Sequence, residues 1–178
     1  MARVFSAIDI EDEEVLDELE HVRDRFDLGF NPVPREQIHV TLQFFQDIDG
    51  EDLEQVKQAM KDVDTESFEA GARGVGAFPS SDYIRVIWAG IDSPEVFDLY
   101  REVSQHEVRE DSDHEFKPHA TLVRVKNLSS GKKRKLQKQF QEFEDHYFGD
   151  FTVDSVKLYE SEMTDRGPEY RLIHRREL

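Results

Sequence analysis

Hydrophobic and polar positions along the 178-residue chain follow two periods, and their order predicts the fold. Apolar or alternating runs, typical of strands, are separated by segments in which apolar residues recur every three or four positions, as in amphipathic helices. Strands are expected at residues 4–10, 37–45, 68–75, 83–91, 116–125, 151–159 and 169–174. Helices are expected at residues 12–26, 49–63, from a Ser93 cap to 108, and from a cap at Ser129 or Ser130 to 147, with a loop at 28–32.

The second half of the chain repeats the order of the first. The pair Ile8-Asp9 recurs 83 residues later as Ile91-Asp92, and a His-x-Thr-Leu sequence at residues 39–42 recurs 80 residues later at 119–122. We therefore expect one bilobal α+β domain over residues 1–178, in which antiparallel sheets of two pseudo-symmetric lobes line a cleft and helices lie outside. The approximate repeat units are 3–77 and 82–160, and 161–178 completes the sheet.

The duplicated His-x-Thr-Leu sequence is the strongest chemical signal. Residues two apart in a strand point to the same face, so His39 projects with Thr41 and His119 with Thr121, while the apolar neighbours enter the core. One such sequence is a weak signal, but two at matched positions are a strong one. The repeat predicts two imidazoles and two hydroxyls aimed at one space.

Two imidazoles suit the hydrolysis of a phosphodiester without a metal. The unperturbed pKa of histidine lies near neutrality, so a neutral ring accepts a proton from water while a protonated ring gives one to the leaving alkoxide. Threonine hydroxyls donate to the non-bridging phosphate oxygens as charge develops on them. The symmetry of the two motifs leaves open which histidine is the acid.

The charge balance changes this picture. The net charge is -17, from 40 acidic against 23 basic residues, and such a balance normally argues against nucleic-acid binding. It is also typical of the hydrated surfaces of halophilic proteins, whose self-repulsion is screened by salt. Binding of a nucleic acid would then depend on a local basic pocket, not on the overall field.

The absence of certain residues narrows the chemistry further. There are no cysteines, which excludes disulfides, thiolate nucleophiles, cysteine zinc sites and iron-sulfur clusters. His106, His114 and His119 share no helical face and there is no His-Glu-x-x-His sequence, so we expect neither metal nor cofactor. No leader-like or bilayer-length apolar run occurs, so a cytoplasmic location is expected.

The sequence resembles the two-histidine phosphoesterase superfamily, specifically its archaeal and bacterial RNA 2′,3′-cyclic phosphodiesterase branch, also called 2′,5′ RNA ligases. The resemblance runs the length of the chain. It rests on the first His-x-Thr-Leu block, on residues 116–124 around the second, on 85–90, and on Ser161 followed by 167–170, in the family's order. With the acidic composition, it points to a halophilic archaeon as the source.

This resemblance implies a role for each site residue. His39 would protonate the departing 3′ oxygen and His119 would activate water, leaving a 2′-phosphate. Thr41 and Thr121 would hold the phosphate, and Arg124 would add a positive contact. Gln43 stands where lysine is frequent in the family, which implies a weaker contact with phosphate or RNA there.

Other residues are weaker candidates for contacts with RNA. Phe44, Phe116 and Tyr170 are suited to stacking on a base, although aromatic residues in strands more often belong to the core. Lys132 and Lys133 lie in a basic run at a predicted helix N-terminus, where they oppose the helix dipole. They either contact the RNA backbone or belong to a solvated helix end.

The leading hypothesis is metal-independent hydrolysis of RNA 2′,3′-cyclic phosphate ends. Two alternatives are ATP-independent 2′,5′ ligation by the reverse reaction and a non-catalytic module that binds RNA ends. Small cyclic nucleotides are a third possibility for the substrate. The expected partner is RNA with a cyclic phosphate end; neither membrane nor protein partner is indicated, and a monomer is the default.

Overall fold

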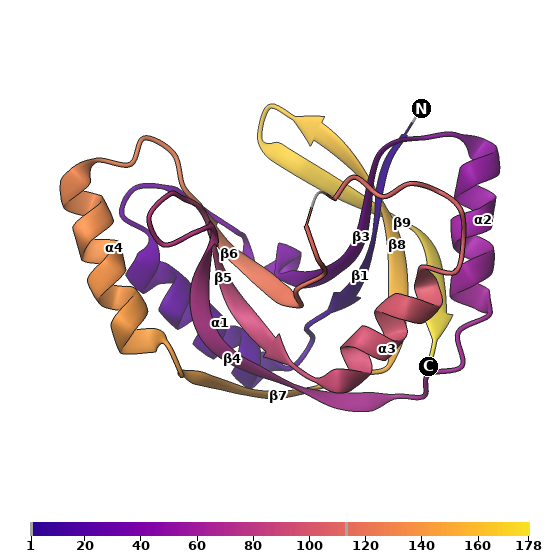
Figure 1. Ribbon diagram of the computed structural model, residues 1–178, viewed down its shortest axis with the longest axis horizontal. Coiled ribbons are helices and arrows are strands. Elements are labelled where there is room, and N and C mark those ends of the chain that lie inside the picture. The colour runs from indigo at the N-terminus through magenta and orange to yellow at the C-terminus, as the bar shows by residue number, and fades with distance from the viewer. Residues whose placement is uncertain (1, 113) are drawn as a thin grey trace.

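The computed structural model describes residues 2–112 and 114–178, and within them one antiparallel sheet carries four α-helices (Figure 1). The strands are β1 (Ala2–Asp9), β2 (Asn31–Pro32), β3 (His39–Ile48), β4 (Phe68–Pro79), β5 (Ile84–Asp92), β6 (His119–Arg124), β7 (Tyr147–Val153), β8 (Ser155–Thr164) and β9 (Gly167–Glu177). The helices are α1 (Glu13–Phe26), α2 (Gly50–Lys61), α3 (Pro94–Val103) and α4 (Ser130–Phe143), with a 3₁₀ turn at Arg35–Gln37.

The sheet has two halves that meet at the histidine strands. The strand order is β7-β4-β5-β6-β3-β1-β8-β9, with β2 beside β6. Between β6 and β3 the register has a single residue pair, Val40 with Ala120, so the two predicted sheets are joined at one narrow point. The α+β bilobal prediction is confirmed, and the histidine of each motif stands where the halves meet. The division into two repeat units stays a prediction.

Helices cover the outside of each half (Figure 1). α1 and α4 pack on the half that holds β4, β6 and β7, while α2 lies against α3 and β9. Side chains of Asp12, Asp49 and Ser129 accept hydrogen bonds from the backbone N–H of the third residue of α1, α2 and α4. Ser93 makes no such bond at α3, because its hydroxyl donates to Glu95. None of the helices within the described residues has the length and apolar character to cross a membrane.

A β-bulge follows the Thr of each motif. On β3 the partners of Thr41 and Gln43 are consecutive residues of β1, so Leu42 is the extra residue; on β6 the extra residue is Leu122. One inserted residue reverses the alternation of every later side chain. Phe44 and Arg124, each five positions after its histidine, therefore face the same side as His39 and His119.

Several predicted boundaries are wrong for identifiable reasons. The strand expected at 151–159 is broken at Asp154, where the chain leaves β7, next to β4, for β8, next to β1. The helix expected to reach 108 ends at Val103, and the one expected to reach 147 ends at Phe143. β6 starts at His119 because Pro118 has no N–H for a ladder. The predicted loop at 28–32 contains β2, which pairs with Arg124 and Val123.

Candidate active site

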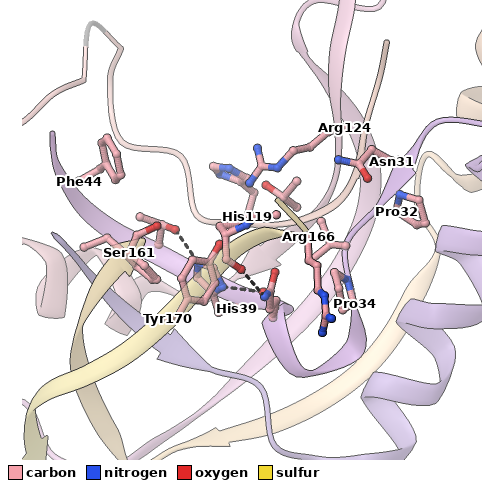
Figure 2. A pocket seen from close by; sticks show the side chains of 17 residues that line it. Asn31, Pro32, Pro34, His39, Phe44, His119, Arg124, Ser161, Arg166 and Tyr170 are labelled. Atoms are coloured by element: carbon pink, nitrogen blue, oxygen red, sulfur yellow. Dashed lines mark hydrogen bonds between the residues drawn. The ribbon is translucent and has the colours of Figure 1, made fainter. Parts of the chain in front are cut away.

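A cavity of about 230 Å³ lies where the two histidine strands meet (Figure 2). It is bordered by the histidine strands, the segment around β2, and the hairpin formed by β8 and β9. The lining residues are Phe5, Asn31, Pro32, Val33, Pro34, Gln37, His39, Thr41, Phe44, His119, Thr121, Arg124, Ser161, Arg166, Gly167, Pro168 and Tyr170.

The His39 ring is held at both nitrogens. Nδ1 lies 2.7 Å from the carbonyl oxygen of Gln37, and Nε2 lies 2.9 Å from the Oγ1 of Thr41. Phe5 stacks on the ring at 5.0 Å between centroids, and Tyr170 meets it edge-on at 5.8 Å. The aromatic walls fix the plane of the imidazole and direct Nε2 toward the cavity.

The His119 ring is held in the same way at one nitrogen only. Its Nδ1 lies 2.6 Å from the carbonyl oxygen of Lys117, two residues earlier in the chain. Gln37 is likewise two residues before His39. Phe78 meets the ring edge-on at 4.8 Å, and Trp88 lies at 6.2 Å. Within residues 2–112 and 114–178 no hydrogen bond is made by Nε2 of this ring, which leaves that nitrogen available to a ligand.

The two backbone contacts decide the tautomer of each neutral ring. A carbonyl oxygen only accepts, so Nδ1 carries the hydrogen in both rings, and Nε2 has the lone pair. Burial lowers the pKa of His39, although the contact with Gln37 and the charge of Asp9 act in the opposite direction. Burial also lowers the pKa of His119, and the positive charges of Lys117 and Arg124 lower it further, against the contact with the Lys117 carbonyl.

Asp9 is the carboxylate whose charge acts on the His39 ring. It pairs with His39 across β1 and β3, and its Oδ2 accepts hydrogen bonds from Lys157 and, at 2.7 Å, from Tyr159. Burial by itself would lower the pKa of Lys157, but the hydrogen bonds and charges of Asp9 and Glu11 together outweigh it and raise the pKa. The side chain of Asp9 thus contacts an ammonium and a phenol on the His39 side of the site.

The bulges place two different side chains at equivalent positions of the cavity. Phe44 lines it from β3 and Arg124 from β6 (Figure 2). Arg124 forms no ion pair with any carboxylate in the described part of the chain, and its neighbour across the strands is Asn31. A guanidinium with free donors beside two imidazoles suits an oxyanion such as phosphate.

The β8–β9 hairpin forms one wall of the cavity. Gln37 Nε2 donates to the carbonyl of Pro168 at 2.8 Å, so the residue that orients His39 also fastens the hairpin. The hairpin also contributes Arg166 and Ser161 to the lining of the cavity (Figure 2). Arg166 and Asn31 were not identified from the sequence. Their only local signals are a Gly-Pro turn and a loop containing Pro.

Four candidates lie outside the lining of the cavity. Phe116 stacks on Tyr100 of α3 at 4.0 Å between centroids. Gln43 is 1% exposed, and its amide bonds to His106 and Glu110, so its difference from lysine does not alter the cavity wall. The ammonium of Lys132 lies 5.3 Å from the centre of the Phe30 ring, and Lys133 follows it on α4.

Comparisons with known proteins place this site in a family. The sequence profile of LigT-like phosphoesterases matches residues 8–88 and again residues 92–170. The chain belongs to the LigT-like phosphoesterase family. The expected membership of the two-histidine superfamily is thereby confirmed, and each match spans one His-x-Thr-Leu sequence.

Relatives of this LigT-like phosphoesterase cover nearly its whole length. The chain is 31% identical over 174 residues to the RNA 2′,3′-cyclic phosphodiesterase of Methanocaldococcus jannaschii, covering 96% of this chain and 98% of the relative. It is 34% identical over 176 residues to the protein of the same name from Methanothermobacter thermautotrophicus, covering 94% of each.

Solved structures agree with this fold. TT0787 of Thermus thermophilus superposes with a TM-score of 0.81 at 26% identity, covering 99% of this chain and 97% of that one. Escherichia coli LigT complexed with 3′-AMP superposes with a TM-score of 0.74 at 21% identity, covering 99% and 98%. The second likeness concerns the fold alone.

Proposed function

We propose that this LigT-like phosphoesterase hydrolyses the 2′,3′-cyclic phosphate at the end of RNA to a 2′-phosphate. The observation that carries the proposal is the pair of partly buried imidazoles on one cavity, each with Nδ1 on a backbone carbonyl. Among the residues that the structure describes, Nε2 of His119 makes no hydrogen bond and Nε2 of His39 contacts the hydroxyl of Thr41. The names of the archaeal relatives support RNA cyclic phosphate as the substrate class.

In the proposed reaction two protons move in opposite directions. Neutral His119 accepts a proton from water at Nε2 as the water oxygen attacks phosphorus. The bond from phosphorus to the 3′ oxygen breaks, and protonated His39 gives its Nε2 proton to that oxygen. The products are a 2′-phosphate and a 3′-hydroxyl, and proton exchange with solvent restores both rings.

The surrounding charges support this assignment of acid and base. Asp9 favours the protonated form of His39, whereas Lys117 favours the neutral form of His119. Arg124 lowers the pKa of both rings and does not distinguish them. Thr41 and Thr121 line the cavity on the same faces as the rings and would donate to the non-bridging oxygens. Arg124 would balance the charge of the phosphate during attack.

The test uses an RNA oligonucleotide with a 2′,3′-cyclic phosphate end, in the presence of a chelator. Within the described residues no three His, Asp or Glu side chains gather as metal ligands, and the mechanism needs none. We expect a product that is one water heavier and carries a 2′-phosphate. His39→Ala and His119→Ala should each lower kcat by about 10²–10⁴-fold.

Rates near wild type in both variants, or loss of wild-type activity with the chelator, would contradict the proposal. Adding an RNA with a 5′-hydroxyl end to the same reaction measures the ligation alternative. A joined product in place of the 2′-phosphate end would reassign the enzyme to 2′,5′ ligation.

We also propose that the protein is a cytoplasmic monomer from a halophilic archaeon, built from the two repeat units 3–77 and 82–160. The net charge of -17 supports adaptation to salt. The midpoint of thermal unfolding should therefore rise from 0.1 M to ~2 M KCl as repulsion is screened. A midpoint that is constant or falls over this range would contradict the halophilic origin.

A further inference from the structure

One stretch of this acidic chain has the opposite charge. From Phe116 to Gln141 there is no acidic residue, although the chain has 40 of them. The same 26 residues include eight of its 23 basic ones. These are Lys117, Arg124, Lys126, Lys132, Lys133, Arg134, Lys135 and Lys138.

These eight side chains are also without carboxylate partners. No ion pair involves any of them across residues 2–112 and 114–178, whereas Arg23, Arg35 and Lys157 elsewhere are paired. In a protein with excess carboxylates, unpaired cations gathered in one segment leave a positive surface open to an external polyanion.

The basic residues at the N-terminus of α4 reduce the stability of that helix. The first turns of α1, α2 and α3 contain acidic residues, which the helix dipole favours, but the first turn of α4 contains none. Lys132 and Lys133 stand there instead, at a cost to the helix, and Arg134 follows them. Basic residues that destabilise a helix N-terminus and gain no compensating contact indicate that the positions serve a function.

This positive surface is continuous with the cavity. Arg124 lines the cavity and pairs with Asn31, which lines it too. The preceding residue, Phe30, carries the ammonium of Lys132 over its ring. A chain of contacts therefore leads from the phosphate end of the cavity to the N-terminus of α4.

The opposite side of the cavity is acidic. The loop between α3 and β6 runs beside Phe44, whose carbonyl accepts from Asp111 N at 2.8 Å. Glu107, Glu110 and Glu115 belong to the same loop. A nucleic-acid backbone leaving the cavity on this side would meet like charge.

We propose that the RNA strand leaves the cavity over Asn31 and that its upstream phosphates bind the α4 surface formed by Lys132, Lys133, Arg134 and Lys135. This inference rests on the proposed function and deepens it: the substrate is an RNA oligomer, held by phosphates that a cyclic mononucleotide lacks. The contacts are to the backbone and carry no base sequence.

The test compares an eight-nucleotide RNA ending in a cyclic phosphate with a 2′,3′-cyclic mononucleotide. In the double variant Lys132→Gln/Lys133→Gln, the ratio of kcat/KM for the oligomer to that for the mononucleotide should fall by at least about tenfold in 50 mM KCl. The slope of log kcat/KM against log salt for the oligomer should become shallower by about 1.4, or 0.7 per lost phosphate contact.

The matched control is Lys57→Gln/Lys61→Gln on α2, which removes the same charge at the equivalent helix and should leave the ratio unchanged. An unchanged ratio in the α4 variant, or an equal fall in the control, would overturn the proposal. If the wild type hydrolyses neither substrate, the proposed function fails. Fluorescence anisotropy of the labelled oligomer with the wild type and both variants then tests the α4 surface separately, because weaker binding in the α4 variant alone would still support it.

Discussion

The two histidine strands and the helices that follow them share one pattern but carry opposite charge. Residues 36–61 contain six acidic and two basic residues, whereas residues 116–141, 80 positions later, contain eight basic and none acidic. Both segments hold a His-x-Thr-Leu sequence, a bulge at its Leu and an amphipathic helix. The pattern of apolar residues maintains the fold in both segments, so the polar positions can carry opposite charge without altering it.

The two halves also differ in the aromatic residues that lie beside the histidines. Phe5 on β1 faces Tyr159 across the strands, whereas Trp88 on β5, 83 residues later, faces Gly76. A Cβ at Gly76 would lie 2.4 Å from the Trp88 ring, so the large indole requires glycine opposite it. The two halves fill similar space with different pairs, and a symmetric scaffold thus holds an asymmetric site.

The largest expected effect comes from changing the leaving group of the substrate, which distinguishes the acid from the base among the two histidines. A thiolate leaves without protonation, so a cyclic substrate with sulfur at the 3′ bridging position needs no general acid. On this substrate His39→Ala should recover to within about tenfold of wild type, while His119→Ala keeps a defect of about 10²-fold or more. Rates of the two variants on the oxygen and sulfur substrates measure the difference. If His119→Ala recovered activity on the sulfur substrate instead, His119 would be the acid and His39 the base.

A smaller effect is expected at the equivalent bulge positions. Arg124→Ala removes a cation that meets developing charge, so kcat should fall by about 10²-fold. Phe44→Ala removes an apolar wall and should raise KM by less than about tenfold with kcat nearly unchanged. Steady-state kinetics on the cyclic-phosphate oligomer distinguish the two. Equal losses of kcat would mean that the halves contribute alike to the transition state.

Sequence reasoning reached the paired histidines because alternation and duplication are local patterns. His39 with Thr41 and His119 with Thr121 share faces as expected, and Val40 and Ala120 are buried. The alternation failed after each bulge, where it would put Gln43 in the cavity and Phe44 in the core. A bulge depends on register with the neighbouring strand, β1 or β5, which no short segment of sequence specifies.

The remaining wall of the cavity was missed for a related reason. Arg166 reaches it from a hairpin near the C-terminus, and Asn31 from a two-residue strand paired with β6. Their positions follow from contacts between residues about 90 or more apart in the chain, and neither has a motif of its own. The basic run at Lys132 and Lys133 is visible in the sequence, but its two interpretations stay open there, because its position relative to the cavity depends on the fold.

The smallest expected effect concerns the pH dependence of kcat/KM, and it examines both sides of the site together. His39 must be protonated, so activity is lost as pH rises through its pKa; His119 must be neutral, so activity is lost as pH falls through its pKa. Asp9→Asn removes the charge that raises the pKa of His39, and the basic limb should move to lower pH. Lys117→Met removes a charge that lowers the pKa of His119, and the acidic limb should move to higher pH.

The two variants should thus narrow the bell-shaped plot of kcat/KM against pH from opposite sides. In the wild type the maximum of that plot should lie below pH 6.5, since burial lowers the pKa of both histidines. Asp92→Asn is the matched control, because Asp92 occupies the position of Asp9 in the other half but is not among the charges that shift the pKa of His39 or His119, and its profile should match wild type. If Asp9→Asn moved the acidic limb instead, His39 would be the base, and the charges around the two rings would serve the reverse assignment.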